Sequence, residues 1–242
     1  MACFDEYRNS SLVEFSSMVA FLGPQLRFPD SESASPDGLI AVGGDLSTER
    51  LLLAYRTGIF PWPVQRMLTW FCPDPRAILE LDELIIHRSL AKRMRRGGYE
   101  VRVNSAFADV IRACACRTES RPSTWILPQL VEAYQRMHLA GWAHSVEVWA
   151  DNELVGGLYG VSIGGLFAGE SMFSVMPDAS KIALCHLVER MKVRGLTLLD
   201  VQVPNPHLAT LGVKALPRRA FLERLKVAVA QPVSFLDPTE IR

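Results

Sequence analysis

The sequence predicts an α+β fold in which a small N-terminal domain precedes a larger C-terminal domain with a mixed, mainly antiparallel sheet. Three consecutive strand-like segments between residues 144 and 173 are joined by short turns, which indicates an antiparallel meander. A helical segment and one more strand-like segment follow the meander, a succession typical of α+β domains. Four prolines between residues 59 and 76 exclude a long element there and separate the two predicted domains.

Length, composition and charge narrow the class of protein. Of the 242 residues, 49% are hydrophobic and 21% charged, which suits a globular protein and excludes disorder. No apolar run approaches the roughly 18 residues of a membrane span, and the first seven residues lack the features of a signal peptide. Five cysteines without a regular framework favour a reducing cytoplasm, and nothing demands more than a monomer. Because 26 basic residues balance 26 acidic ones, any nucleic-acid site must be local.

The predicted N-terminal domain, residues 1–75, carries one clear strand and one clear helix. The apolar run 39–42 predicts a strand that ends at a pair of glycines. Ser47 is a suitable N-cap for the helix that follows, and Gly58 stands where that helix should stop. The inward face of the helix is expected to carry Leu51, Leu52 and Tyr55.

The predicted C-terminal domain, residues 76–242, begins with short elements. Apolar runs predict two short strands, at 77–81 and 84–86. Apolar spacing then predicts a helix that ends at Gly97, a strand over 99–103, a helix over 107–114, a polar loop over 117–124 and a helix over 130–138.

The core of this domain is expected to be the meander and the two elements after it. The predicted elements are strands at 144–149, 154–161 and 166–173, a helix over 179–194 and a strand over 196–203.

The common motifs for nucleophiles, metals and phosphates are incomplete in this chain. The segment Gly169–Phe173 begins like a nucleophile elbow but lacks its closing glycine. Cys114 and Cys116 have no second Cys or His pair at the spacing of zinc ligands. There is no phosphate-binding loop of the G-x-x-x-x-G-K-[ST] type, nor the glycine-rich turn that holds the pyrophosphate of acyl-CoA. These observations predict no metal site.

A cluster of basic residues is more informative. Arg88, Lys92, Arg95 and Arg96 recur at helical spacing and gather on one face of a predicted helix. Such a face is either simply solvated or binds phosphates. Because the segment 84–99 contains no acidic residue to pair with these cations, a phosphate backbone is a suitable partner.

Several aromatic and polar residues stand in contexts that suggest a binding site. Trp62 and Trp125 lie in proline-rich or loop segments, where tryptophan either fills the core or stacks on a base or an apolar ligand. Glu170 lies inside an apolar strand, where a lone acid is either at a solvated edge or needs a partner. Asp200 and Gln202 are two apart on one strand, so both are expected on the same face, as a site wall or a satisfied core pair.

Taken together, these residues resemble a known family, the bacterial leucyl/phenylalanyl-tRNA–protein transferases. The resemblance extends from residue 38 to about 225. The matching segments are Gly38–Ser47, Gly58–Trp62, Pro73–Arg76, Thr124–Ile126, His144–Trp149, Leu154–Gly160, Gly169–Ser174, Ala179–Lys181 and Asp200–Val203.

The resemblance implies both a fold and an activity. The fold would be a small N-terminal domain plus a C-terminal domain like that of the GNAT acetyltransferases. The activity would move leucine, phenylalanine and, as a further candidate, methionine from aminoacyl-tRNA to proteins with N-terminal Arg or Lys, marking them for degradation. Because the aminoacyl ester is already activated, neither a metal nor an organic cofactor is implied.

The resemblance also implies the residues of the site. In the family's pattern Glu170 would orient amino groups, whereas Asp200 and Gln202 would form a relay that helps to remove a proton from the attacking amine. The basic helix would hold the tRNA acceptor stem. The predicted strands add apolar surface for the aminoacyl side chain, so the predicted pocket for the aminoacyl group and the 3′-adenosine comprises Trp62, Trp125, Leu158, Phe167, Gly169, Met172 and Leu199.

Two other classes of protein stay open. A GNAT-like N-acyltransferase that uses acyl-CoA would have the same fold, but the missing pyrophosphate loop argues against it. A non-catalytic RNA-binding module would explain the cations and tryptophans, but it would leave Glu170, Asp200 and Gln202 without a task.

Overall fold

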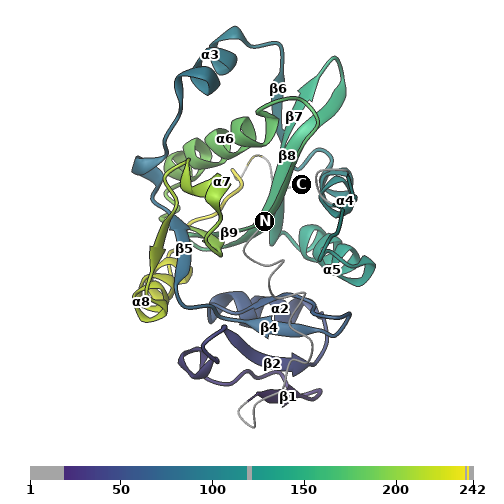
Figure 1. The fold of residues 1–242 in the computed structure, drawn as a ribbon, viewed down its shortest axis with the longest axis vertical. Helices are drawn as coiled ribbons and strands as arrows, with labels where there is room; N and C mark the ends of the chain where they lie inside the picture. Colours follow the sequence, from purple (N-terminus) through teal and green to yellow (C-terminus); the bar gives the residue numbers. More distant parts are fainter. Residues whose placement is uncertain (1–18, 119–121, 238, 240–242) are drawn as a thin grey trace.

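The computed structural model describes residues 19–118, 122–237 and 239 (Figure 1). The strands are β1 (Ala20–Leu22), β2 (Leu39–Gly43), β3 (Phe60–Pro61), β4 (Thr69–Phe71), β5 (Arg76–Leu79), β6 (Glu100–Val103), β7 (Ala143–Ala150), β8 (Glu153–Ile163), β9 (Leu166–Ser174), β10 (Leu198–Gln202) and β11 (Lys214–Leu216). The helices are α2 (Thr48–Arg56), α3 (Arg88–Arg96), α4 (Phe107–Ala115), α5 (Pro128–Leu139), α6 (Ala179–Arg194), α7 (Pro206–Ala209) and α8 (Arg218–Val229).

A four-stranded sheet in the order β1-β2-β4-β3 forms the N-terminal part of the described chain. Its strands are short because prolines and turns interrupt them. As predicted, Ser47 caps α2: its side chain accepts a hydrogen bond from the backbone N–H of Arg50 at 3.4 Å. Leu51 and Tyr55 are buried on the inner face of α2, also as predicted.

A seven-stranded sheet in the order β11-β5-β10-β9-β8-β7-β6 forms the second part. The neighbours β7, β8 and β9 pair antiparallel, which confirms the predicted meander. Strand β10 pairs parallel to β9 after the chain has crossed over through α6. The sheet is therefore mixed and mainly antiparallel, and the predicted α+β class is confirmed.

Helices cover both faces of the larger sheet. Figure 1 shows α6 on one face of the meander and α4 with α5 on the other. The α4–α5 side shares its buried cluster with the N-terminal sheet, because Tyr55 and Trp70 belong to the same cluster as Tyr134 and Tyr159. The two sheets thus meet at a common core. The boundary predicted between residues 75 and 76 stays a prediction.

The structure differs from the sequence-based prediction at 84–86 and describes only part of the predicted loop 117–124. The segment 84–86 is not a strand: residues 81–83 form a short 3-10 helix, and Ile85 and Ile86 are exposed. Apolar character alone suggested a strand there, but no neighbouring strand offers a ladder of hydrogen bonds, and Ile85 makes a single backbone bond to Leu211. Within the predicted loop 117–124, residues 119–121 lie outside the described part of the chain. In the described residues, no helix has the length and apolar character to cross a membrane.

Candidate active site

The parallel strands β9 and β10 part from each other partway along their length. Their pairing runs from Leu198 opposite Leu166 to Asp200 opposite Ala168, whereas β9 continues to Ser174. Glu170 and Gln202 each lie two residues beyond the last pair. Parallel strands that separate at their carboxyl ends open a crevice in the sheet, which is a common place for a ligand.

A cavity of about 980 Å³ occupies this opening. Its wall combines residues from the fork with residues from the N-terminal sheet and from the loop before α5. Of the residues that the sequence assigned to a catalytic or substrate-binding role, the wall contains Trp62, Trp125, Leu158, Gly169, Glu170, Met172, Leu199 and Gln202.

Glu170 is the buried acid of this cavity. Only 9% of the residue is exposed, and its carboxylate accepts hydrogen bonds from Tyr55 at 2.7 Å, Tyr134 at 2.8 Å and the side-chain amide of Gln202 at 2.6 Å. The predicted need for a partner is thus met by two tyrosines and a glutamine. The three hydrogen-bonding groups come from α2, α5 and β10, so both parts of the chain build this centre.

The proton content of this cluster follows from its geometry. The two tyrosine hydroxyls also lie 2.5 Å apart, so Tyr55, Tyr134 and Glu170 make three short O···O contacts. Two hydroxyls carry two protons, and a third proton on Glu170 gives every contact one. Burial raises the pKa of Glu170 to about 7, although the hydrogen bonds from Tyr55, Tyr134 and Gln202 lower it. Glu170 can therefore take up and release a proton near neutral pH.

Asp200 has a different environment. It is 2% exposed and forms a bidentate ion pair with buried Arg76, with N···O distances of 2.8 and 2.6 Å. The Arg76 guanidinium lies between the rings of Phe60 and Phe221, within 4.7 Å of both ring centres. Burial acts to lower the pKa of Arg76, but the Asp200 carboxylate outweighs it and the pKa is raised. Arg76 therefore stays charged, and the bidentate pair acts as a structural clamp.

The expectation that Asp200 and Gln202 share one face of a regular strand is wrong. The register of β10 against β5 shifts between these residues, and Gln202 has a left-handed φ of 66°. As a result Gln202 lines the cavity and bonds to Glu170, whereas Asp200 lies outside the cavity wall and holds Arg76. Asp200 still touches the site through the backbone, because its carboxylate accepts a 2.8 Å hydrogen bond from the N–H of Gln202.

The two predicted tryptophans contact each other in the cavity wall. The rings of Trp62 and Trp125 are stacked, with centres 4.6 Å apart and planes at 18°. Both are partly buried and both line the cavity. A stacked indole pair in a cavity wall is suited to a planar base.

Three of the four apolar side chains that the sequence predicts for the pocket line the cavity. Leu158, Met172 and Leu199 line the cavity, but Phe167 does not. Phe167 is fully buried and packs against the ring of Phe235 at 5.1 Å, so it supports the wall from behind. Further apolar residues of the wall are Leu184, Leu187, Val201 and Leu208.

The basic helix α3 lies away from this cavity. It packs against α6 and, in Figure 1, stands at the opposite end of the molecule from the N-terminal sheet. Leu90 is buried, while the four predicted cations are exposed and form no ion pair with any carboxylate in the described residues. The cations of this exposed face are Arg88, Lys92, Arg95 and Arg96.

Comparison with known proteins decides the family. The family model described as leucyl/phenylalanyl-tRNA protein transferase matches residues 78–226, and the model of that family's N-terminal domain matches residues 44–74. The enzyme of that name from Chromobacterium violaceum is 49% identical over 218 residues, which cover 89% of this chain and 94% of the relative. The chain belongs to this family. The corresponding enzyme from Thiobacillus denitrificans is 51% identical over 212 residues, which cover 85% and 91% of the two chains.

The family resemblance read from the sequence is thus confirmed, and the chain is a transferase. Among solved structures, a GCN5-related N-acetyltransferase from Sphaerobacter thermophilus aligns with a TM-score of 0.37 and 17% identity, covering 77% of this transferase and 60% of that chain.

Sequence reasoning missed four residues of the transferase site. Tyr55 was expected only as a core residue, and Tyr134 only as part of a helical face; Arg76 was noted as part of a motif without a role. Tyr159 lines the cavity, and its buried hydroxyl has no hydrogen-bond partner among the described atoms. Tyr55, Tyr134 and Arg76 carry no local signal, because their hydrogen-bond partners are distant in sequence. Within the described residues, no group of three or more His, Cys, Asp or Glu side chains could hold a metal ion.

Proposed function

We propose that the protein transfers leucine, phenylalanine and, as a further candidate, methionine from aminoacyl-tRNA to proteins with N-terminal Arg or Lys. The new N-terminal residue would mark the acceptor for degradation in the cytoplasm. The observation that carries the proposal is the cavity at the fork of β9 and β10, where a buried carboxylate, an apolar wall and a tryptophan pair surround one space. An aminoacyl-adenosine offers an amine, an apolar side chain and a base to these three regions.

The reaction needs an amine nucleophile and a leaving group, and the ester supplies the second. The α-amine of the acceptor attacks the ester carbonyl carbon, the new C–N bond forms, and the C–O bond to the ribose breaks. The ribose oxygen leaves with one proton from the attacking nitrogen. Since the ester is already activated, the proposed reaction requires no metal and no organic cofactor.

An N-terminal amine has a pKa of about 8 and therefore reaches the site mainly as an ammonium. It must lose one proton before it can attack. Glu170 is the suitable acceptor, because its pKa is raised to about 7 by burial and the transferred proton completes the contacts with Tyr55 and Tyr134. Gln202 donates to Glu170 at 2.6 Å and is placed to orient the amine. Asp200, held by Arg76, fixes the backbone at Gln202 and acts as a positioning residue.

The shape of the cavity predicts which amino acids are transferred. Leu158, Met172 and Leu199 offer apolar surface for long side chains, and charged or amide side chains would lose hydration there without recompense. An added Cβ at Gly169 would meet one described protein atom within 4 Å, the Asp200 carbonyl oxygen at 3.7 Å, so the space beside Gly169 is available to the substrate. Close approach of the reacting carbonyl there would exclude a methyl group on the substrate's Cβ.

We therefore expect transfer of Leu, Phe and Met and rejection of Ile and Val, measured by competition between amino acids charged on one tRNA body. A difference of one methylene in an apolar pocket gives about 10- to 200-fold discrimination, so stronger rejection indicates a clash at Cβ. Isoleucine transferred as well as leucine would contradict this arrangement of the pocket while leaving the transferase activity in place.

The exposed cations of α3 predict a phosphate contact with the tRNA acceptor stem. Replacing Arg95 and Arg96 with alanine should weaken binding of all tRNAs alike, because phosphate contacts carry no base specificity. The slope of log affinity against log salt should fall by roughly one per lost contact. The measurement is tRNA binding between low and physiological salt, and an unchanged slope would make α3 a solvated face.

A further inference from the structure

The charged side chains in the cavity wall are divided between its floor and its mouth. Among the described residues that line the cavity, three carry a formal charge: Glu170, Arg66 and Arg117. Glu170 is buried at the fork, whereas both arginines are exposed. The cavity wall therefore combines a buried acidic residue and two exposed basic residues with apolar and aromatic side chains. A ligand that matches this combination has a cationic group, an apolar and planar part, and an anionic group.

The backbone around Arg66 is held in an unusual conformation. Val64 and Met67 pair across a tight turn through two backbone hydrogen bonds of 3.1 and 2.9 Å. The two residues of the turn, Gln65 and Arg66, both have a left-handed φ, of 49° and 69°. Turns of this kind favour Asn and Gly, since a side chain makes a positive φ costly. Strain kept at a cavity mouth points to a role for the side chain that it places there.

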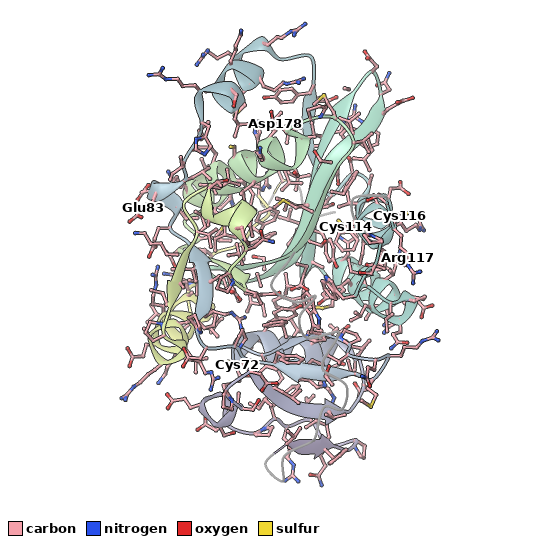
Figure 2. All side chains as sticks on the ribbon, viewed as in Figure 1. Cys72, Glu83, Cys114, Cys116, Arg117 and Asp178 are labelled. Carbon is pink, nitrogen blue, oxygen red and sulfur yellow. The ribbon has the colours of Figure 1, made fainter. Side chains whose placement is uncertain are left out.

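Arg117 also lines this cavity. It follows the end of α4, and Figure 2 shows it beside α4 and α5. Cys114, one turn earlier, is also part of the wall. Neither Arg66 nor Arg117 forms an ion pair with a carboxylate in the described part of the chain. Both guanidinium groups are therefore available to an anion.

Each arginine belongs to the same segment as one of the stacked tryptophans. Trp62 precedes Arg66 by four residues along the turn, and Trp125 follows Arg117 by eight. Because all four side chains line one cavity, a base placed on the tryptophan pair would have two cations in the same cavity as the phosphates attached to it. Guanidinium groups suit this task because they donate two parallel hydrogen bonds to a phosphate.

We propose that Arg66 and Arg117 form a subsite for the phosphodiester groups of the 3′-terminal nucleotides of the aminoacyl-tRNA. This inference rests on the proposed function and extends it from the aminoacyl-adenosine to the nucleotides before it. The basic face of α3 lies on a separate element packed against α6, so it would hold a different part of the tRNA. The two groups of cations therefore make separable contributions to substrate binding.

Substrates of increasing length separate these contributions. Leucyl-adenosine has no phosphate, a leucyl-CCA trinucleotide adds phosphodiesters, and leucyl-tRNA adds the acceptor stem. For the double variant Arg66→Gln/Arg117→Gln, the ratio of kcat/KM on leucyl-CCA to that on leucyl-adenosine should fall by about 10- to 100-fold, the scale of two charge-assisted contacts. Arg66→Gly, which the left-handed φ favours, should show a smaller fall of the same kind without disturbing the turn.

Two controls locate the effect. Arg112→Gln removes an exposed arginine on α4 that pairs with Asp109 outside the cavity, and it should leave the ratio unchanged. The α3 variant Arg95→Ala/Arg96→Ala should lower transfer from leucyl-tRNA but not the ratio between the two short substrates.

Three results would overturn the subsite. Wild-type kcat/KM on both short substrates in the double variant would show that the arginines do not contact phosphates. An equal loss on leucyl-adenosine would show that they support the pocket instead. In both cases the proposed function would still hold as long as the wild-type protein transfers leucine from leucyl-tRNA. Wild-type protein that transfers from none of the three substrates would contradict the proposed function, and the subsite with it.

Discussion

Replacing Glu170 with glutamine is expected to lower transfer by roughly 100-fold or more, the scale of a lost proton acceptor, and to stabilise the unliganded protein at pH 8. Glutamine has nearly the shape of a protonated glutamate, so the contacts with Tyr55, Tyr134 and Gln202 can be kept. It cannot take a proton from the ammonium of the acceptor. Activity and stability should therefore change in opposite directions.

The stability effect has a defined pH range. Burial raises the pKa of Glu170 from 4.5 to about 7 in the folded protein. The stability that the protonated group contributes is fully present below about pH 4.5 and is lost as the pH rises through 7, which amounts to about 3 kcal/mol. Because glutamine does not titrate, the variant should gain several degrees of melting temperature on the wild type between pH 5 and pH 8.

The measurement is thermal unfolding of both proteins at pH 5 and pH 8, together with transfer at each pH. Glu132→Gln, at an exposed position of α5, is the matched control and should change neither quantity. A melting-temperature difference that does not depend on pH would contradict the buried, titrating Glu170. Near-wild-type transfer by Glu170→Gln would remove this acid from the mechanism.

Removal of Arg76 should have the largest effect on folding. In Arg76→Met the Asp200 carboxylate stays buried without its partner, and breaking a buried pair in this way costs about 3–5 kcal/mol. The half-exposed bidentate pair between Arg224 and Glu80 offers a matched control. Arg224→Met should cost no more than about 1 kcal/mol, because solvent screens that pair. Denaturant unfolding measures both.

A double variant separates folding from function at the same position. Arg76→Met/Asp200→Leu replaces both charges by apolar groups, which is often neutral or stabilising for a buried pair. It should recover most of the stability lost in Arg76→Met. It should not recover transfer, because the hydrogen bond from the N–H of Gln202 to Asp200 is lost. Recovery of both would show that Asp200 has no positioning role at Gln202.

Local patterns predicted most of the fold because each element carries its own signal. The meander follows from turns too short for any other connection, and helix α6 has the predicted bounds. The predicted strand at 84–86 failed because an apolar run cannot report whether a neighbouring strand is available to pair.

The sequence predicted which polar residues belong to the candidate site, but it did not predict most of their hydrogen-bond partners. Glu170 and Gln202 stood out as polar groups on apolar strands, and they do meet. The sequence could not predict that Asp200 lies outside the cavity wall. Its position follows from the register shift in β10, which depends on pairing with β5, more than 100 residues earlier in the chain. Tyr55 and Tyr134 reach Glu170 from sequence positions 115 and 36 residues away, so only the tertiary structure brings them together.

The central claim is that this cavity transfers an aminoacyl group from tRNA rather than an acyl group from coenzyme A. The direct measurement is the mass of a peptide that begins with Arg after incubation with the purified protein and either leucyl-tRNA or acetyl-CoA. A leucyl group added to the N-terminus with leucyl-tRNA, and no product with acetyl-CoA, is the result that we predict. An acetylated peptide, or binding of leucyl-tRNA without any product, would contradict the claim.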